Sequence, residues 1–577
     1  MALTLSGCSS AQTAGGAGDG YGNWPVDDSA VVDGAADVSL EGAYLAGNWA
    51  FESNDFKSAS DFFEVVRKID RNNPGILGRS FLTTAATSEH EKTLELARLL
   101  SEELPDQPLA NTALIVEEAL LGNWDRVLEK LAVIPERGVN AIAFPLYRAW
   151  TYQALGQTDQ AYATLDSLSA NEGIDSLRKQ QKALIADLSG EQDLARQLFE
   201  ELMETEQPTL RQQQVAANFH ARHGQMEKAV ELLEQLQRDG LLNEVLRREL
   251  EALRAGTVPE PLVPDAQAAF GEILFSIASL LAREDASDVA LIYLQQALRL
   301  QTGIAQENSR LFIAELYQAM GQSAEAVASY RTIPSDSPFA WTSALQIAQE
   351  LDAMGRREEA IASLDELAQS RTDRFEPLLR KGNILRFEER FAEAAVAYSG
   401  ALERIGTIED RHWSLFYFRG IAFERAKDWE KAEKDFLKAL ELFPDQPFVL
   451  NYLAYSWVEQ ERNLQQAEEM LIKAVELRPE DGFIVDSLGW AYYRLGKFED
   501  AVTYLERAVE LQAEEATIND HLGDAYWRVG RRHEARFQWR RALSFGPEDG
   551  QGPIIEEKLL NGLPPLDSDV VADQKEL

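Results

Sequence analysis

The stretch DSLGWAYYRLGKFEDAVTYLERAVEL, residues 486–511, decides the fold of this chain. The next stretch, DHLGDAYWRVGRRHEARFQWRRALSF, residues 520–545, keeps a glycine, a tyrosine and two alanines at the same offsets and changes most other positions. Small residues let two antiparallel helices approach closely, and large residues fill the gaps that remain between them. The pattern therefore predicts a helical hairpin that is repeated along the chain.

Further copies of the pattern precede these two at a spacing of about 34 residues. They are anchored at Gly382, Gly420 and Ala454, and weaker copies extend toward the amino terminus, with the loosest fit over residues 74–137. A period of 34 residues is that of the tetratricopeptide repeat, a pair of helices that stacks on its neighbours. We therefore expect an all-α tetratricopeptide (TPR) superhelical solenoid of about fourteen helix pairs, between Leu40 and Asp549.

One segment interrupts the repeats. Residues 256–265 hold Pro259, Pro261 and Pro264, and three prolines in six residues exclude a helix. The interruption predicts an amino-terminal array over 40–255 and a carboxyl-terminal array over 266–549, although one continuous solenoid with a longer loop explains it equally well. Residues 550–577 read as a capping helix followed by an acidic tail.

The amino terminus carries a possible lipidation site. Leu5-Ser6-Gly7-Cys8 is similar to the lipobox of bacterial lipoproteins, and Cys8 is the only cysteine of the chain. Residues 1–7 then read as a residual lipoprotein signal, Cys8 as the acylated residue, and the Gly-, Ala- and Ser-rich residues 8–39 as a flexible tether. Ser9 after the cysteine favours the outer membrane. The alternative is an ordinary cysteine near a chain end.

The charge of the chain limits its partners. With 96 acidic and 56 basic residues, the formal net charge is −40. Such a surface repels phosphate backbones, so we expect no nucleic-acid partner.

Signatures of catalysis are weak. His220 and His223 lie three residues apart but lack further ligands in a metal-binding rhythm, so ordinary histidines near a helix end are favoured. Asp520, His521 and Asp524 could form a base between carboxylates, but no partnered nucleophile is visible, and polar groove residues are favoured. We expect no catalytic residue, no metal and no cofactor.

The inward positions of the last four repeats are rich in aromatic residues. They predict a groove that binds protein, because tyrosine and tryptophan supply large contact areas; packing between repeats is the alternative for some of them. The predicted groove residues are Tyr417, Phe418, Phe448, Asn451, Tyr452, Tyr455, Phe483, Asp486, Trp490, Tyr493, Asp520, Asp524, Trp527 and Arg528. The cations of a carboxylate clamp are missing from these positions.

A basic cluster stands near the end of the repeats. Three of its members are spaced by four residues and should share one helix face. The cluster could bind an anionic partner or lipid headgroups, or it could be a solvated face, which we favour slightly. Its members are Arg528, Arg531, Arg532, Arg536, Arg540 and Arg541.

Residues 449–511, taken with the lipobox and the length, resemble a proteobacterial family of tetratricopeptide outer-membrane lipoproteins. That resemblance implies a non-enzymatic adaptor that binds a periplasmic carboxyl-terminal processing serine protease and its clients, peptidoglycan hydrolases. A TPR scaffold for outer-membrane or peptidoglycan-synthesis assembly is the alternative, and a hydrolase hidden in the array is a third hypothesis.

Overall fold

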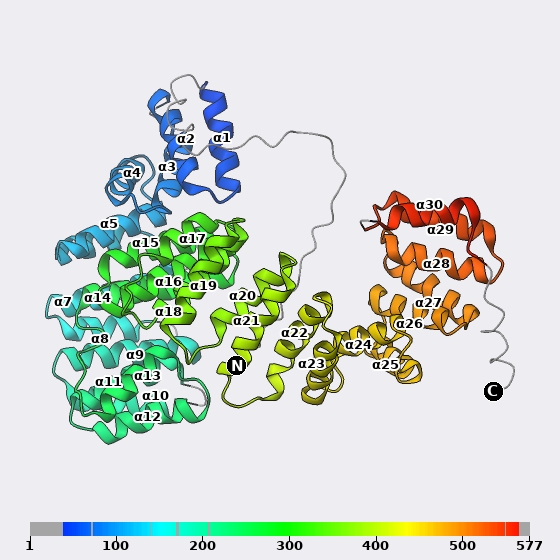
Figure 1. The fold of residues 1–577 in the computed structure, drawn as a ribbon. Helices are drawn as coiled ribbons and strands as arrows, with labels where there is room; N and C mark the ends of the chain where they lie inside the picture. Colours follow the sequence, from blue (N-terminus) through cyan, green and yellow to red (C-terminus); the bar gives the residue numbers. More distant parts are fainter. Residues whose placement is uncertain are drawn as a thin grey trace. The chain divides into compact units, whose positions relative to one another are not determined.

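The computed structural model describes residues 39–70, 73–138, 140–168, 172–205, 208–548 and 550–564. The predictions for Cys8, for the tether up to residue 38 and for the acidic tail from residue 565 lie outside the described residues. The chain forms two compact units, which meet between Ala340 and Trp341. Every regular element that the structure describes is a helix (Figure 1).

Unit 1 holds six helix pairs, a single helix and two further pairs. Its helices are α1 (Leu40–Glu52), α2 (Phe56–Ile69), α3 (Pro74–Ala85), α4 (His90–Glu103), α5 (Pro108–Leu120), α6 (Trp124–Val133), α7 (Asn140–Ala154), α8 (Thr158–Asp166), α9 (Glu172–Leu188), α10 (Gln192–Met203), α11 (Leu210–Arg222), α12 (Met226–Arg238), α13 (Glu244–Arg254), α14 (Ala266–Arg283), α15 (Ser287–Leu300), α16 (Gly303–Ala319) and α17 (Ser323–Tyr330).

Unit 2 holds six helix pairs and a final helix. Its elements are α18 (Ala340–Ala353), α19 (Arg357–Ser370), α20 (Glu376–Phe387), α21 (Phe391–Arg404), the short 3₁₀ helix η2 (Asp410–His412), α22 (Trp413–Arg425), α23 (Trp429–Leu442), α24 (Pro447–Glu459), α25 (Leu464–Leu477), α26 (Gly482–Arg494), α27 (Phe498–Leu511), α28 (Ala516–Arg528), α29 (Arg532–Ser544) and α30 (Gln551–Asn561).

The described helices therefore form fourteen pairs, with α13 and α30 in addition, which confirms the predicted all-α tetratricopeptide solenoid. Residues 256–265 contain no helix, as their prolines require. They connect α13 to α14 inside unit 1. The division into arrays at this segment stays a prediction, since the two compact units meet at another place.

The small residue of each repeat is explained by its distance to the paired helix. A β-carbon on Gly523 would lie 2.5 Å from the Trp539 ring, and one on Gly420 would lie 2.7 Å from the Phe436 ring. Both rings are fully buried. Glycine thus lets the aromatic side chain of the second helix pack directly on the backbone of the first.

The turn between the two helices of a hairpin requires a residue in the left-handed backbone conformation. Gly496 and Gly530 follow α26 and α28 with φ angles of 76° and 83°. This left-handed conformation carries no steric penalty for glycine. It ends the first helix and lets the chain reverse into the second.

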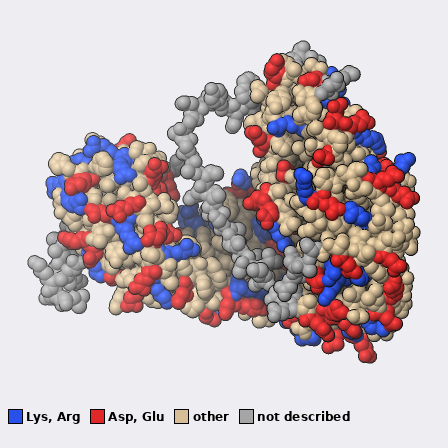
Figure 2. Space-filling view, turned by 180° about the vertical axis from the view of Figure 1, so that it is seen from behind, with Lys and Arg blue, Asp and Glu red and all other residues tan. Residues whose placement is uncertain are grey.

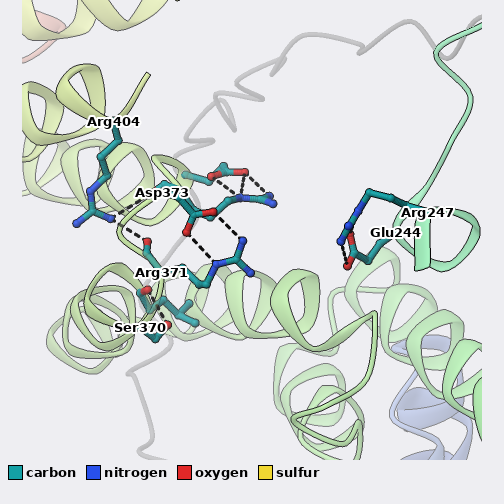
Figure 3. Close-up of polar contacts among 9 residues, drawn as sticks. Glu244, Arg247, Ser370, Arg371, Asp373 and Arg404 are labelled. Carbon is teal, nitrogen blue, oxygen red and sulfur yellow. Dashed lines mark hydrogen bonds and ion pairs between the residues drawn. The ribbon is translucent and has the colours of Figure 1, made fainter. Parts of the chain in front are cut away.

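Many exposed charged side chains form ion pairs with neighbouring side chains of the same helix or turn. Figure 3 shows Arg247 paired with Glu244 within α13, and Arg371 paired with Asp373 in the turn between α19 and α20. In the same turn, Arg404 Nη1 donates to the carbonyl oxygen of Arg374 at 2.9 Å. Acidic and basic side chains are interspersed over the surface in Figure 2. Within the described residues, no helix is long and apolar enough to cross a membrane.

Candidate protein-binding surface

The first helix of each pair supplies the inner face of a tetratricopeptide array. In unit 2 these helices include α24, α26 and α28, which contact one another in succession. The other helices that pack extensively against them are their hairpin partners and sequence neighbours. No second layer of described helices therefore covers α24 and α26 on this face, whereas Lys558 of α30 and the segment that follows it contact the inward residues of α28.

Two phenylalanines stand at equivalent positions of this inner face. Phe448 near the start of α24 is 38% exposed, and Phe483 near the start of α26 is 48% exposed. The Arg478 guanidinium lies 5.3 Å from the centre of the Phe448 ring. These two exposed rings, one on each of two successive repeats, are apolar groups that a partner can bury, and we call Phe448 and Phe483 together the strip.

Other predicted groove aromatics pack between repeats. The rings of Tyr417 and Tyr452 meet edge to face at 6.1 Å, and Phe418 stacks on Tyr398 at 6.5 Å. The Tyr452 hydroxyl donates to Glu424 Oε2 at 3.0 Å. Burial raises the pKa of Tyr417 to about 12. These rings support the strip rather than forming its exposed surface.

Trp490 lies at the centre of a stack of rings. It lies 4.0 Å from the His521 ring and 4.7 Å from the Tyr493 ring, nearly parallel to both. Its Nε1 donates to Glu459 Oε1 at 2.6 Å. The half-buried Trp490 is thereby held in one orientation at the edge of the strip.

His521 is paired with Asp486 in the interior of this stack. The His521 Nδ1 atom lies 3.0 Å from Asp486 Oδ2. Burial alone would lower the pKa of His521, but the Asp486 carboxylate, with Asp520 and Asp524 beyond it, outweighs that effect and raises the pKa. The histidine is therefore favoured in its charged form and joins α26 to α28.

Asp520 and Asp524 are paired with the final helix. Lys558 of α30 donates to Asp520 Oδ2 at 2.7 Å and to Asp524 Oδ2 at 2.9 Å, and Trp539 Nε1 donates to Asp524 Oδ1 at 2.8 Å. Burial raises the pKa of Asp524 to about 6, and Asp520 adds to the rise. Asp520 Oδ1 has no hydrogen-bond partner among the residues that the structure describes, and the other carboxylate oxygens join α28 to α29 and α30.

The remaining groove residues differ in their surroundings. Tyr455 and Asn451 of α24 are half-buried, and Asn451 Oδ1 is enclosed without a described hydrogen-bond partner. Burial raises the pKa of Tyr455. Trp527 packs on Trp539 at 5.5 Å, and Arg528 donates to the Tyr493 hydroxyl at 3.2 Å and to the Pro564 carbonyl at 2.6 Å.

The arginines of the basic cluster differ in their partners. Arg531 pairs with Glu506, and Arg541 donates to the carbonyl oxygen of Ala513. Arg532 and Arg536 lie 4.9 Å and 5.1 Å from the centre of the Trp527 ring. Arg540 Nε donates to the carbonyl of Arg536 at 3.0 Å. The predicted stripe of Arg532, Arg536 and Arg540 has no carboxylate partner among the described residues.

His220 and His223 have separate partners. His220 is fully buried, and its Nδ1 lies 2.6 Å from Gln225 Oε1. His223 Nε2 lies 2.7 Å from Asp187 Oδ1, a carboxylate from α9 that the sequence spacing did not indicate. Across the described residues, no group of three or more His, Cys, Asp or Glu side chains has the geometry to hold a metal ion.

Part of the inner face of unit 1 is covered by the chain itself, which the sequence did not predict. Helix α14 packs on α7, and α15 packs on α5, as Figure 1 shows. Phe270 of α14 is fully buried and lies 4.5 Å from the Tyr147 ring of α7.

Side chains of this returning segment also bind the carbonyl ends of the first helices. Gln267 donates to the Ala119 carbonyl at 2.9 Å, Tyr317 to Ala86 at 3.3 Å, and Gln322 to Ser53 at 2.6 Å. The last carbonyls of a helix have no partner within the helix. Side chains of the returning segment α14–α17 thus cap the carboxyl ends of α1, α3 and α5.

A signal for this arrangement exists in the sequence. Helix α14 has 18 residues, compared with 13 in α5, and residues 289–294 of α15 are an unbroken apolar run. A helix that is apolar on most sides is expected to be covered on most sides.

Comparison with known proteins supports the repeat assignment. Residues 489–530 match a family model described as TPR repeat, and residues 413–446 and 145–171 match models described as tetratricopeptide repeat. Proteins with such repeats are in general non-catalytic scaffolds that bind other proteins. No curated protein matches the chain in sequence.

Solved structures with similar architecture are distant. The Cut9–Hcn1 hetero-tetramer of APC/C is 14% identical over 92% of this chain and 98% of that chain, with a TM-score of 0.36. A tetratricopeptide repeat protein from Parabacteroides merdae is 16% identical over 50% and 97%, with a TM-score of 0.34. Yeast Tom70 is 12% identical over 93% and 96%, with a TM-score of 0.29.

Proposed function

We propose that this protein is a non-enzymatic scaffold that binds partner proteins on the inner face of unit 2. The observation that carries the proposal is the exposed strip of Phe448 and Phe483, which no second layer of described helices covers. Trp490, on the same helix as Phe483, is already held by its hydrogen bond to Glu459, so it loses little conformational entropy when a partner binds.

The specific role that we propose is that of an adaptor for proteolysis. The partner is a periplasmic carboxyl-terminal processing serine protease, and the clients are peptidoglycan hydrolases. The resemblance of residues 449–511 to the lipoprotein family supports this assignment. In the same proposal, lipid on Cys8 anchors the protein to the outer membrane, facing the periplasm.

An adaptor of this kind accelerates cleavage without chemistry of its own. Holding protease and client on one chain turns their encounter into an intramolecular event with a high effective concentration. The purified protein alone should cleave nothing. Added to the protease, it should increase the rate of client degradation.

Affinity measurement on the full chain tests the proposal. Phe448→Ala and Phe483→Ala together should weaken binding to a carboxyl-terminal processing protease by about tenfold or more, because buried aromatic anchors dominate such interfaces. Phe537→Ala is the matched control, since Phe537 is 55% exposed on the second helix of its pair.

Each result has a distinct meaning. Equal affinity for the double variant and the control would reject the strip as the binding surface. Binding of wall-synthesis enzymes or porin precursors with no acceleration of any processing protease would support the assembly-scaffold alternative instead.

A further inference from the structure

A hollow of about 420 Å³ lies on the first helices of unit 1, far along the chain from the strip of unit 2. Its wall is mostly apolar. It is lined by Phe51, Pro74, Gly75, Gly78, Arg79, Leu82, Leu100, Leu104 and Gln107, which belong to α1, α3, α4 and the start of α5.

The glycines of this hollow differ from the other helical glycines. A β-carbon on Gly523 or Gly420 would collide with a buried ring, so packing requires glycine there. A β-carbon on Gly78 would meet nothing within 4 Å, and one on Gly75 would meet only the Asn73 side chain at 3.3 Å. Glycine weakens a helix relative to alanine. At Gly78 it leaves open space and satisfies no packing constraint.

Arg79 supplies a charge at the edge of the hollow. It is exposed, and its guanidinium lies 5.8 Å from the centre of the Phe51 ring. No carboxylate among the described residues pairs with it. Arg79 is therefore available to a carboxylate from outside.

The returning segment α14–α17 leaves this end of the inner face open. Its hydrogen bonds end at Ser53 and Ala86, the first of which is two residues from Phe51 in the wall, and no residue of α14–α17 lines the hollow. On α1, Leu45 is 67% exposed and Trp49 is 71% exposed. Trp49 lies on the side of α1 away from Phe51, so this exposed apolar face is separate from the hollow.

We propose that this hollow binds an extended segment of a partner protein in which a large apolar side chain stands beside an aspartate or glutamate. The apolar side chain enters the space left by Gly78, between Phe51 and Leu82. The neighbouring carboxylate pairs with the fork of Arg79 donors. This site is separate from the strip of unit 2 and does not depend on the function proposed for it.

A capped peptide serves as the probe, with the full chain as receptor. Fluorescein-labelled Gly-Ser-Ser-Phe-Asp-Ser-Ser-Gly, blocked at both ends, is titrated by fluorescence anisotropy. Replacing its Phe by Ala should weaken binding by about tenfold or more, and replacing its Asp by Asn by about threefold. The Arg79→Gln variant should bind the Asp and Asn peptides equally.

Gly78→Leu is the decisive variant, because it fills the hollow without disturbing the fold. It should abolish peptide binding while the melting temperature stays equal or rises, since leucine favours the helix. Gly406→Leu is the matched control: a β-carbon on Gly406 also meets nothing within 4 Å, but this glycine lies in a loop of unit 2. The control should bind like the unsubstituted protein.

Several results would overturn the proposal. Unchanged binding to Gly78→Leu would place the peptide elsewhere, and a preference for Asp that survives Arg79→Gln would exclude the proposed ion pair. Tighter binding of a peptide that ends in Phe with a free carboxyl group would change the class of ligand. Binding that requires removal of residues 1–38 would assign the hollow to this chain itself.

Discussion

The two units use the same helical hairpin in opposite ways. In unit 1, the inner face of the repeats is covered by α14 and α15, so residues at inward positions, such as Tyr147, are part of the core. In unit 2, the equivalent face of α24 and α26 has no such cover and exposes Phe448 and Phe483. The comparison teaches that the repeat pattern sets which residues point inward, whereas the path of the rest of the chain decides whether they become core or surface.

Removing one aromatic ring from the inner side of each unit should give the largest difference between the units in the free energy of unfolding. Phe270→Ala deletes a fully buried ring stacked on Tyr147 and should lower the free energy of unfolding by about 3–5 kcal/mol. Phe483→Ala deletes a ring that is 48% exposed and should change it by about 0.5 kcal/mol or less. Urea denaturation followed by tryptophan fluorescence measures both, and equal losses would contradict the comparison.

Two glycine-to-alanine substitutions should change the stability of the protein in opposite directions. Gly523→Ala places a methyl group against the buried Trp539 ring and should destabilise the protein by about 1–3 kcal/mol. Gly78→Ala meets open space and should stabilise it by about 0.5–1 kcal/mol, because alanine is the better helix former. Thermal unfolding checks the pair; a loss of stability in Gly78→Ala would show that the hollow requires glycine for packing.

The buried network at the end of unit 2 should make stability depend on pH. Burial raises the pKa of Asp524 from 3.8 to about 6, so the folded state holds this proton more tightly than the unfolded state. The raised pKa of His521 acts in the same direction above pH 6.5. A group with a raised folded pKa contributes stability that is complete below its unfolded pKa and is lost as pH rises through its folded pKa.

We therefore expect the stability contributed by Asp524 to fall by on the order of 1–3 kcal/mol between about pH 4 and pH 6. The contribution of His521 is present below pH 6.5 and is lost at higher pH. Asp524→Asn removes the first titration and should flatten the stability profile between pH 4 and 6. An unchanged profile in this variant would assign the pH dependence to other groups.

The smallest effect is expected at an exposed ion pair. The hydrogen bond from Arg371 lowers the pKa of Asp373 to about 2, but both side chains are more than half exposed (Figure 3). Asp373→Asn should leave the melting temperature unchanged, because solvent screens such pairs. NMR titration of the Asp373 carboxyl group should show the lowered pKa, and a normal pKa would mean that the pair does not form in solution.

The sequence was a good guide to local structure for a physical reason. Gly489 and Gly523 are required by contacts within one hairpin, and such local contacts repeat at each period. The presence of about fourteen pairs could therefore be predicted from the sequence. The return of α14–α17 could not be predicted in the same way, because it depends on the cumulative rotation of six preceding pairs.

In the candidate site, too, the residues could be predicted from the sequence, but their contacts with distant parts of the chain could not. Phe448 and Phe483 were predicted at the inner face, and the structure leaves them exposed. Asp486, Asp520 and Asp524 were predicted there too, but contacts of about 35 residues in sequence separation join them to His521 and Lys558. The sequence of one helix determines which of its residues face inward. Whether such a residue is buried depends on the side chains of the neighbouring helix.

Hydrogen exchange of the full chain, with and without a carboxyl-terminal processing protease, tests the central claim most directly. The account predicts that amides of α14 and α15 exchange slowly in the free protein, and that the protease adds protection to α24 and α26 of unit 2. Added protection confined to the second helices α23, α25 and α27 of the pairs, or fast exchange of α14 in the free protein, would contradict it.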